Sequence, residues 1–187
     1  MDRIFPLALC AVLGFALTAC AGVSPPRADD VPGKLAPGPN AAFALVAAAR
    51  GVQIYQCRET AGAPGTYAWA FVAPEADLFD AGGQKIGRHF AGPQWEARDG
   101  SAIVGTVRER VDAPQADAIP WLLLSAKSVG PEGTFSRIAS VQRVHTVGGA
   151  APSRACTQSA AGTTERVPYT ADYYFWTASS SAGYSSY

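Results

Sequence analysis

The chain has 187 residues and carries 15 basic and 15 acidic side chains, so its formal net charge is zero. This balance argues against binding to nucleic acid, which a protein normally meets with a basic patch, and it gives no electrostatic reason to bind anionic lipid. Glycine motifs for nucleotides, serine-nucleophile motifs and closely spaced metal-binding histidines are all absent from the sequence. No cofactor and no metal are therefore expected.

Residues 1–19 predict a cleavable export signal. Arg3 supplies a positive charge, and residues 4–17 are apolar almost throughout, a stretch shorter than the ~20 residues that a membrane span needs. The four residues from Leu17 to Cys20 resemble the lipobox of bacterial lipoproteins, in which the signal is cut before the cysteine and the thiol receives a diacylglycerol. The alternative is an ordinary secretory signal cut near Ala19 or Ala21.

The resemblance to a lipobox implies where the protein resides. Two or three acyl chains anchor a protein stably in a membrane, whereas one chain is marginal. Ala21 rather than aspartate follows Cys20, which by the same resemblance favours an outer-membrane lipoprotein that faces the periplasm. The membrane is thus the first expected partner of the chain, through lipidated Cys20.

Four segments follow from this prediction. After the signal, residues 20–39 contain five prolines interspersed with Gly, Asp and Ser, a composition that favours an extended tether. Residues 40–177 form one domain, and the Ser-rich residues 178–187 predict a disordered tail. Without its signal the chain keeps 168 residues, with 14 basic and 14 acidic side chains, which suits one domain with a sizeable core.

The domain shows the alternation of strands and the turn signals of an all-β protein. Apolar and polar residues alternate, or apolar residues cluster, in six segments: 52–57, 67–71, 103–111, 119–126, 135–147 and 169–176. The near-continuous apolar run at 119–126 is typical of a strand buried on both faces. Residues 40–50 are rich in alanine but are also expected to form a strand. Glycine-rich turns separate the segments, so we predict a single-domain antiparallel β-sandwich or barrel.

Two cysteines remain in the exported domain, Cys57 and Cys156. In an oxidising compartment a lone pair of cysteines usually forms a disulfide. The loop that this bond would close has ~100 residues, for which the chain-entropy model gives about 4–5 kcal/mol of stabilisation. Metal binding by two cysteines so far apart in sequence is not favoured.

Several segments together resemble the DUF3455 family of uncharacterised secreted proteins. They lie at 51–57 (GVQIYQC), 67–69, 89–96 (HFAGPQWE), 99–101, 119–124 (IPWLLL), 141–149 and 167–175 (VPYTADYYF). The resemblance spans about residues 31–176 and implies export and a β-rich fold, but no activity and no catalytic residue. One departure is His145, where the family leads us to expect a small polar residue such as asparagine.

The best candidate site lies in segment 89–99. His89 exchanges protons near neutral pH, Trp95 offers a stacking surface, and Glu96 and Asp99 supply carboxylates. With Asp172 as a further acid, these side chains are hypothesised to converge on one pocket. The alternative interpretation makes residues 92–93 a turn and Trp95 a core residue, and leaves Glu96 and Asp99 solvated or capping a hairpin. A metal site from His89, His145 and a carboxylate has no supporting motif.

The four tryptophans are divided between core and surface. Trp69 and Trp121 have apolar neighbours and are expected in the core, whereas Trp95, Tyr174 and Trp176 adjoin acidic residues and are better suited to exposure. Exposed aromatic side chains stack on sugar rings or peptides.

Three classes of function are consistent with the sequence. The first is a non-enzymatic binding or envelope-associated module that recognises a small molecule, a glycan or a protein. The second is a hydrolase of envelope polymers with Glu96 or Asp99 as acid or base. The third is a purely structural surface protein.

Overall fold

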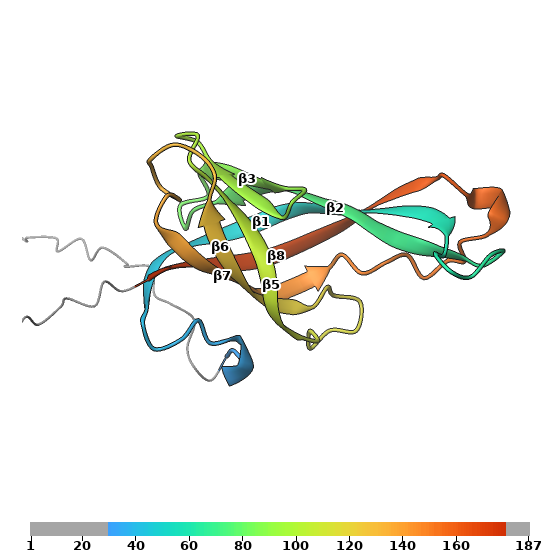
Figure 1. The fold of residues 1–187 in the computed structure, drawn as a ribbon, viewed down its shortest axis with the longest axis horizontal. Coiled ribbons are helices and arrows are strands. Elements are labelled where there is room, and N and C mark those ends of the chain that lie inside the picture. Colours follow the sequence, from blue (N-terminus) through green and yellow to red (C-terminus); the bar gives the residue numbers. More distant parts are fainter. Residues whose placement is uncertain (1–29, 179–187) are drawn as a thin grey trace, which may run out of the picture.

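The structure, a computed structural model, describes residues 30–178 and shows eight antiparallel strands in one closed sheet (Figure 1). The elements, in chain order, are the 3-10 helix η1 (Gly33–Leu35), β1 (Ala41–Glu59), β2 (Tyr67–Phe79), β3 (Lys85–Phe90), β4 (Gln94–Ala97), β5 (Ala102–Val111), β6 (Trp121–Ser128), β7 (Ile138–Gly148), the 3-10 helix η2 (Gln158–Ala160) and β8 (Thr164–Ala178). Each strand pairs with the next, and β8 pairs with β1. The all-β prediction is confirmed, and the ring closes as a barrel.

The predicted strands are all present, including the alanine-rich segment at the start of β1. Small side chains suit this position because Ala47 and Ala49 point into the barrel and are fully buried in its core. The short strands β3 and β4 were not predicted as strands, because Gly87, Gly92 and Pro93 interrupt the apolar pattern there. Within residues 30–178, no helix is long and apolar enough to cross a membrane.

The interior of the barrel holds the main apolar core. Its largest members include Trp95, Phe135, Phe175 and Tyr173, each at most 1 % exposed. The rings of Phe135 and Phe175 stack with centroids 4.8 Å apart. Burial of such side chains contributes the dominant favourable free energy of folding.

A second apolar cluster lies on the outer face of the barrel and is covered by the chain's own N-terminal segment. Val31 and Leu35 pack against Trp121, Leu123 and Tyr174. The expectation that residues 119–126 are buried on both faces is met, because Leu124 of β6 faces the interior while Leu123 lies under this cover. Residues 31–35, assigned from the sequence to the tether, are thus part of the domain's packing.

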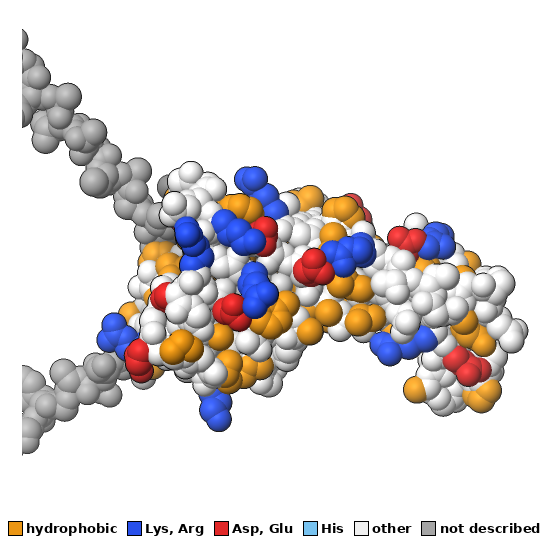
Figure 2. Space-filling model, turned by 90° about the horizontal axis from the view of Figure 1, so that it is seen from above, with side chains coloured by type: hydrophobic (Ala, Val, Ile, Leu, Met, Phe, Trp, Pro, Cys, Tyr) orange, Lys and Arg blue, Asp and Glu red, His pale blue; other side chains and the backbone are white. Residues whose placement is uncertain are grey.

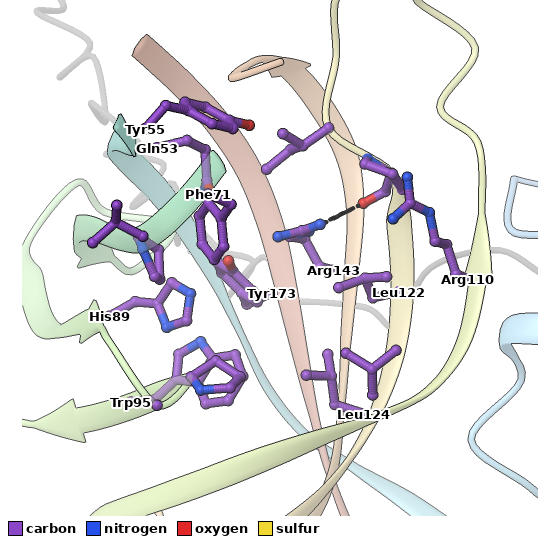
Figure 3. A pocket seen from close by; sticks show the side chains of 17 residues that line it. Gln53, Tyr55, Phe71, His89, Trp95, Arg110, Leu122, Leu124, Arg143 and Tyr173 are labelled. Carbon is purple, nitrogen blue, oxygen red and sulfur yellow. Dashed lines mark hydrogen bonds between the residues drawn. The ribbon is translucent and has the colours of Figure 1, made fainter. Parts of the chain in front are cut away.

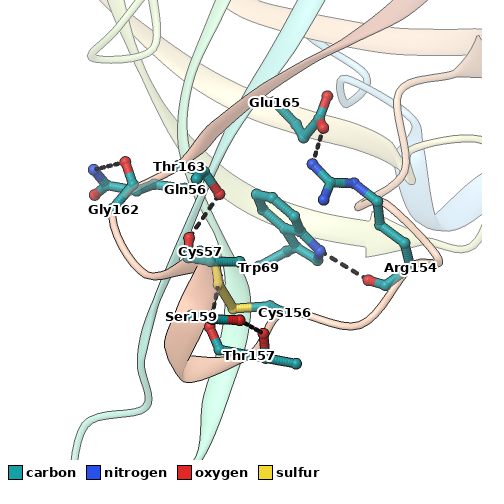
Figure 4. Close-up of a disulfide and its surroundings, with 11 residues drawn as sticks. Gln56, Cys57, Trp69, Arg154, Cys156, Thr157, Ser159, Gly162, Thr163 and Glu165 are labelled. Atoms are coloured by element: carbon teal, nitrogen blue, oxygen red, sulfur yellow. Dashed lines mark hydrogen bonds and ion pairs between the residues drawn. A yellow bond between two sulfur atoms is a disulfide. The ribbon is translucent and has the colours of Figure 1, made fainter.

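The ends of β1, β2 and β8 extend beyond the barrel as an arm, which we define as residues 55–71 and 152–166 (Figure 1). The predicted disulfide between Cys57 and Cys156 is confirmed and ties β1 to the segment before β8 (Figure 4). Trp69 lies beside it. Its Nε1 donates to the carbonyl oxygen of Arg154 at 2.9 Å, and the Arg154 guanidinium, paired with Glu165, lies over its ring.

The placement of the tryptophans corrects part of the sequence interpretation. Trp69 is only partly buried, because the arm is too thin to enclose it, whereas Trp121 is buried as expected. Trp95 is buried rather than exposed, since it faces the barrel interior. Tyr174 is also buried and Trp176 is half-buried, because the N-terminal segment covers their face of β8.

Candidate functional site

A cavity of about 580 Å³ opens at one end of the barrel, next to the arm. All eight strands contribute to its wall. The lining residues are Gln53, Tyr55, Phe71, Val72, Pro74, His89, Gly92, Pro93, Trp95, Val107, Arg110, Ile119, Pro120, Leu122, Leu124, Arg143 and Tyr173 (Figure 3). The cavity exists because inward-facing residues of a closed eight-stranded sheet fill only part of its interior.

Stacked aromatic rings form the floor of the cavity. His89 of β3 and Trp95 of β4 are direct cross-strand neighbours, and their rings stack with centroids 4.5 Å apart and planes 15° apart. Tyr173 of β8 packs against both rings. Gly105 of β5 also approaches Trp95, since a Cβ there would come within 2.7 Å of the indole. The absence of a side chain at this position therefore makes room for the indole.

His89 is neutral and fixed in one tautomer. It is 2 % exposed, and its Nδ1 lies 2.9 Å from the carbonyl oxygen of Gln94. Because a carbonyl oxygen only accepts, Nδ1 carries the proton and Nε2 keeps a free lone pair. Burial lowers the pKa of His89 to about 3, against the smaller opposing effect of the bond to Gln94, and the charge of Arg143 lowers it further. His89 is therefore a hydrogen-bond acceptor at neutral pH.

Two buried donors in the cavity lining lack partners. Gln53 Nε2 and Trp95 Nε1 make no hydrogen bond of normal geometry within the described part of the chain, although the Gln53 amide is close enough to the Tyr169 hydroxyl to oppose the rise of its pKa. Among the same residues, Trp121 Nε1, which does not line the cavity, is unpaired as well. Native proteins pair most buried polar atoms, since an unpaired donor costs about 1–3 kcal/mol.

One wall of the cavity is cationic. Figure 3 shows Arg143 of β7 and Arg110 of β5 across the cavity from His89 and Trp95. Arg143 donates from Nε and Nη2 to the carbonyl oxygen of Pro120, at 3.1 and 2.8 Å. The lining has no acidic side chain.

The mouth of the cavity is apolar and open to solvent. Phe71, Val72 and Val107 line it, and each is about 50 % exposed. Elsewhere the surface is mixed: Figure 2 shows acidic and basic side chains interspersed over one face of the molecule, with no patch of a single sign. Exposed apolar side chains that gather at a concave opening are typical of a ligand-binding site.

Only two of the five predicted site residues, His89 and Trp95, line this cavity. Glu96 forms an ion pair with Arg88 at 2.9 Å, and it alternates with inward-facing Trp95, so it lies on the outer face of β4. Asp172 alternates in the same way with Tyr173. The hypothesis that all five side chains converge on one pocket is therefore wrong, because neighbours in a strand point to opposite faces.

Asp99 has a structural role in a loop, as the alternative interpretation proposed. Its Oδ1 accepts bonds from the backbone nitrogen and hydroxyl of Ser101, at 2.9 and 2.6 Å. Its Oδ2 accepts the same pair from Thr134, at 2.8 and 2.7 Å. These four bonds hold the pKa of Asp99 far below its usual range, with that from the Ser101 hydroxyl contributing most. Asp99 thus joins the β4–β5 turn to the β6–β7 loop.

The second histidine has a conformation that explains its departure from the family pattern. His145 has φ 51°, in the left-handed region, where asparagine and glycine are favoured. Its Nδ1 lies 2.9 Å from Asp172 Oδ2, and its ring meets Trp121 edge-on. These contacts hold the imidazole on the outer face of the barrel, away from His89.

Sequence reasoning missed Gln53, Tyr173 and both arginines as site residues. Gln53, Tyr173 and Arg143 occupy strand positions where alternation leaves a polar group on the same face as apolar core residues. A polar residue in phase with the core of a strand is the signal that points to them. Arg110 lacks this signal, since a bulge between Val107 and Glu109 changes the alternation of β5 before it. Within residues 30–178, no group of three or more His, Cys, Asp or Glu side chains is placed to bind a metal ion.

Comparison with known proteins gives one finding. The family described as "Protein of unknown function (DUF3455)" matches residues 37–177, which include all of the barrel except the last residue of β8, and every residue of the cavity lining. No curated protein and no solved structure matches the chain.

Proposed function

The chain belongs to the DUF3455 family of proteins of unknown function, and from this premise we propose that it is an exported lipoprotein that binds a small molecule in the barrel cavity. The volume of about 580 Å³ falls within the range of small-molecule sites, roughly 300–1,000 Å³. Small eight-stranded barrels have room for side chains or for one small ligand.

The observation that carries this proposal is the lining itself, an apolar wall that also holds two polar groups, the Arg143 guanidinium and the His89 imidazole. A cavity made only for packing would be apolar, because an unpaired buried donor destabilises the fold. A ligand with acceptor atoms can pair with the N–H groups of Arg143 that Pro120 does not use. The acceptor Nε2 of His89 adds a second polar group, in the floor.

Anchoring through Cys20 is the second part of the proposal. β1 begins and β8 ends at the same end of the sheet, where Ala41 pairs with Ala178. Tyr55 lines the cavity and lies toward the other end of β1, where it pairs with Phe71 of β2. A chain held by an acylated Cys20 and a short tether would therefore present the mouth away from the membrane, open to ligands in the periplasm.

A hydrolase that uses Glu96 or Asp99 is the weaker alternative. Neither carboxylate lines the cavity. The oxygens of Asp99 accept four hydrogen bonds, and its lowered pKa keeps it ionised, so it is unsuited to donate a proton. Turnover of an envelope glycan that disappears in Glu96→Gln would favour the enzyme instead.

Binding of the neutral fluorescent probe N-phenyl-1-naphthylamine tests the cavity. We expect the probe to bind the wild type and to bind Leu122→Trp at least about ten-fold more weakly, since the indole fills the space that the probe needs. Val147→Trp is the matched control, because Val147 is exposed and does not line the cavity. Equal binding by all three proteins would refute a ligand site in the barrel.

Mass spectrometry of the protein from envelopes tests the anchor. The expected N-terminus is a diacylated Cys20 without residues 1–19, and Cys20→Ser should move the protein to the soluble periplasmic fraction. An unmodified Cys20, or a protein that fractionates as before after the substitution, would contradict this part of the proposal.

A further inference from the structure

The lining of the cavity carries positive charge although the chain as a whole is neutral. Arg143 and Arg110 line it, and no Asp or Glu does. Among residues 30–178, neither guanidinium lies within 4.0 Å of a carboxylate oxygen, since all six ion pairs found there involve other cations. A partly buried cation without a counter-ion is costly, and a bound anion offsets that cost.

Arg143 keeps hydrogen-bonding capacity for such an anion. Its bonds to Pro120 use one N–H of Nε and one of Nη2, whereas a guanidinium has five. Figure 3 shows the guanidinium near Phe71 and Tyr173. Burial raises the pKa of Tyr173, and the neighbouring Arg143 guanidinium opposes this rise through its charge and its contact with the hydroxyl.

The rest of the cavity wall is apolar. Phe71 and Val107 form part of the rim, and Leu122 and Leu124 of β6 continue the apolar surface inward. A ligand that reaches Arg143 through this mouth must therefore contact carbon atoms on most of its surface. A small inorganic anion would leave these side chains without a partner.

We propose that the cavity binds an amphipathic organic monoanion, with its carboxylate at Arg143 and Arg110 and its apolar body against Phe71, Leu122 and Leu124. This proposal rests on the proposed function, because it names the class of ligand for the same cavity. A planar carboxylate matches the paired donors of a guanidinium, and the low polarity of the surrounding wall strengthens that interaction.

Decanoate, 1-decanol and decylammonium are the probes, because their apolar chains are nearly equal in length and their head groups are anionic, neutral and cationic. The assay measures how well each probe displaces N-phenyl-1-naphthylamine. The protein used is residues 20–187 with Cys20→Ser, because a protein without lipid needs no detergent. At neutral pH we expect decanoate to bind at least about ten-fold more tightly than 1-decanol, or about 1.4 kcal/mol. Decylammonium is expected to bind most weakly.

Two variants identify the groups responsible. Arg143→Gln should remove most of the preference for decanoate over decanol. Arg110→Gln should reduce it less, because Arg110 is exposed and its side chain makes no hydrogen bond that holds the fold within the described residues. Arg108→Gln is the matched control, with the same loss of charge from β5 at a residue that does not line the cavity.

The outcomes separate the two proposals. If decanoate and decanol bind equally and Leu122→Trp weakens both, the cavity binds ligands but the anion inference is overturned. If Arg108→Gln reduces the preference as much as both cavity variants, general charge rather than a site is responsible, and the inference is again overturned. If no probe binds the wild type, the proposed function itself fails.

Discussion

The cavity floor and the Asp99 loop are both polar regions, but they differ in how their polar groups are satisfied. The floor, formed by Gln53, His89, Trp95 and Tyr173, leaves two donors without partners. In the loop, Asp99 accepts four hydrogen bonds from Ser101 and Thr134. A polar group whose bonds are complete holds the fold together, whereas a buried group without a partner reduces stability.

Of the variants in these two regions, Trp95→Ala is expected to have the largest effect on stability. Loss of a fully buried indole that packs against His89 and Gly105 should lower the free energy of unfolding by about 3–5 kcal/mol. Urea denaturation measures it. Trp69→Ala, in the partly exposed arm, is the control and should lower the free energy of unfolding clearly less. Equal decreases in the two variants would mean that Trp95 contributes no more to the stability of the core than Trp69 contributes in the arm.

Acid is expected to destabilise the floor through His89. Its folded pKa is about 3, below the ordinary value of 6.5, so the unfolded chain binds the proton more tightly. Stability from this group is complete above pH 6.5 and falls as the pH falls, by about 2–3 kcal/mol at pH 4.5. Denaturation measured above pH 6.5 and again at pH 4.5 should show this loss of stability in the wild type and not in His89→Phe. The same loss in both proteins would assign it to other groups.

The Asp99 loop should respond to acid only at lower pH. Because the folded pKa of Asp99 is depressed, its stabilising effect is present above its unfolded pKa and disappears as the pH falls through the folded value. Asp99→Ala should lower the midpoint of thermal unfolding, by less than Trp95→Ala, and should leave probe binding unchanged. Weaker probe binding in Asp99→Ala would break the distinction between the two regions.

The smallest effect has the opposite sign. Gln53→Leu replaces a buried amide that has an unpaired donor with an apolar side chain of similar size, so stability should stay equal or rise by up to about 1 kcal/mol. A clear loss of stability would show that Gln53 has a structural role like that of Asp99.

Much of the fold was predictable because it depends on local pattern. Alternation predicted the strands from Val52 to Trp176, and the pairing of Cys57 with Cys156 followed because they are the two cysteines that remain after the predicted signal and lipobox are set aside. The apolar run at 119–126 predicted burial on both faces but not what covers the outer face. That cover comes from Val31 and Leu35, more than 80 positions earlier in the chain.

The site was predictable only in part, for a reason that His89 and Glu96 illustrate. Both were candidates from one short segment, yet His89 lines the cavity and Glu96 pairs with Arg88 on the outside. Residue type and spacing identify polar side chains in a strand. They do not say which face of the strand becomes the inside of the barrel.

The sequence alone determined the all-β class, the disulfide and the family, since each depends on composition, alternation or motifs that the chain carries locally. The tertiary structure decided that the sheet closes, that Gln53, Arg143 and Tyr173 face one cavity, and that Asp99 and Asp172 do not. The physical reason is that closure joins strands distant in sequence, β1 to β8, and so brings together side chains whose distances no local pattern encodes.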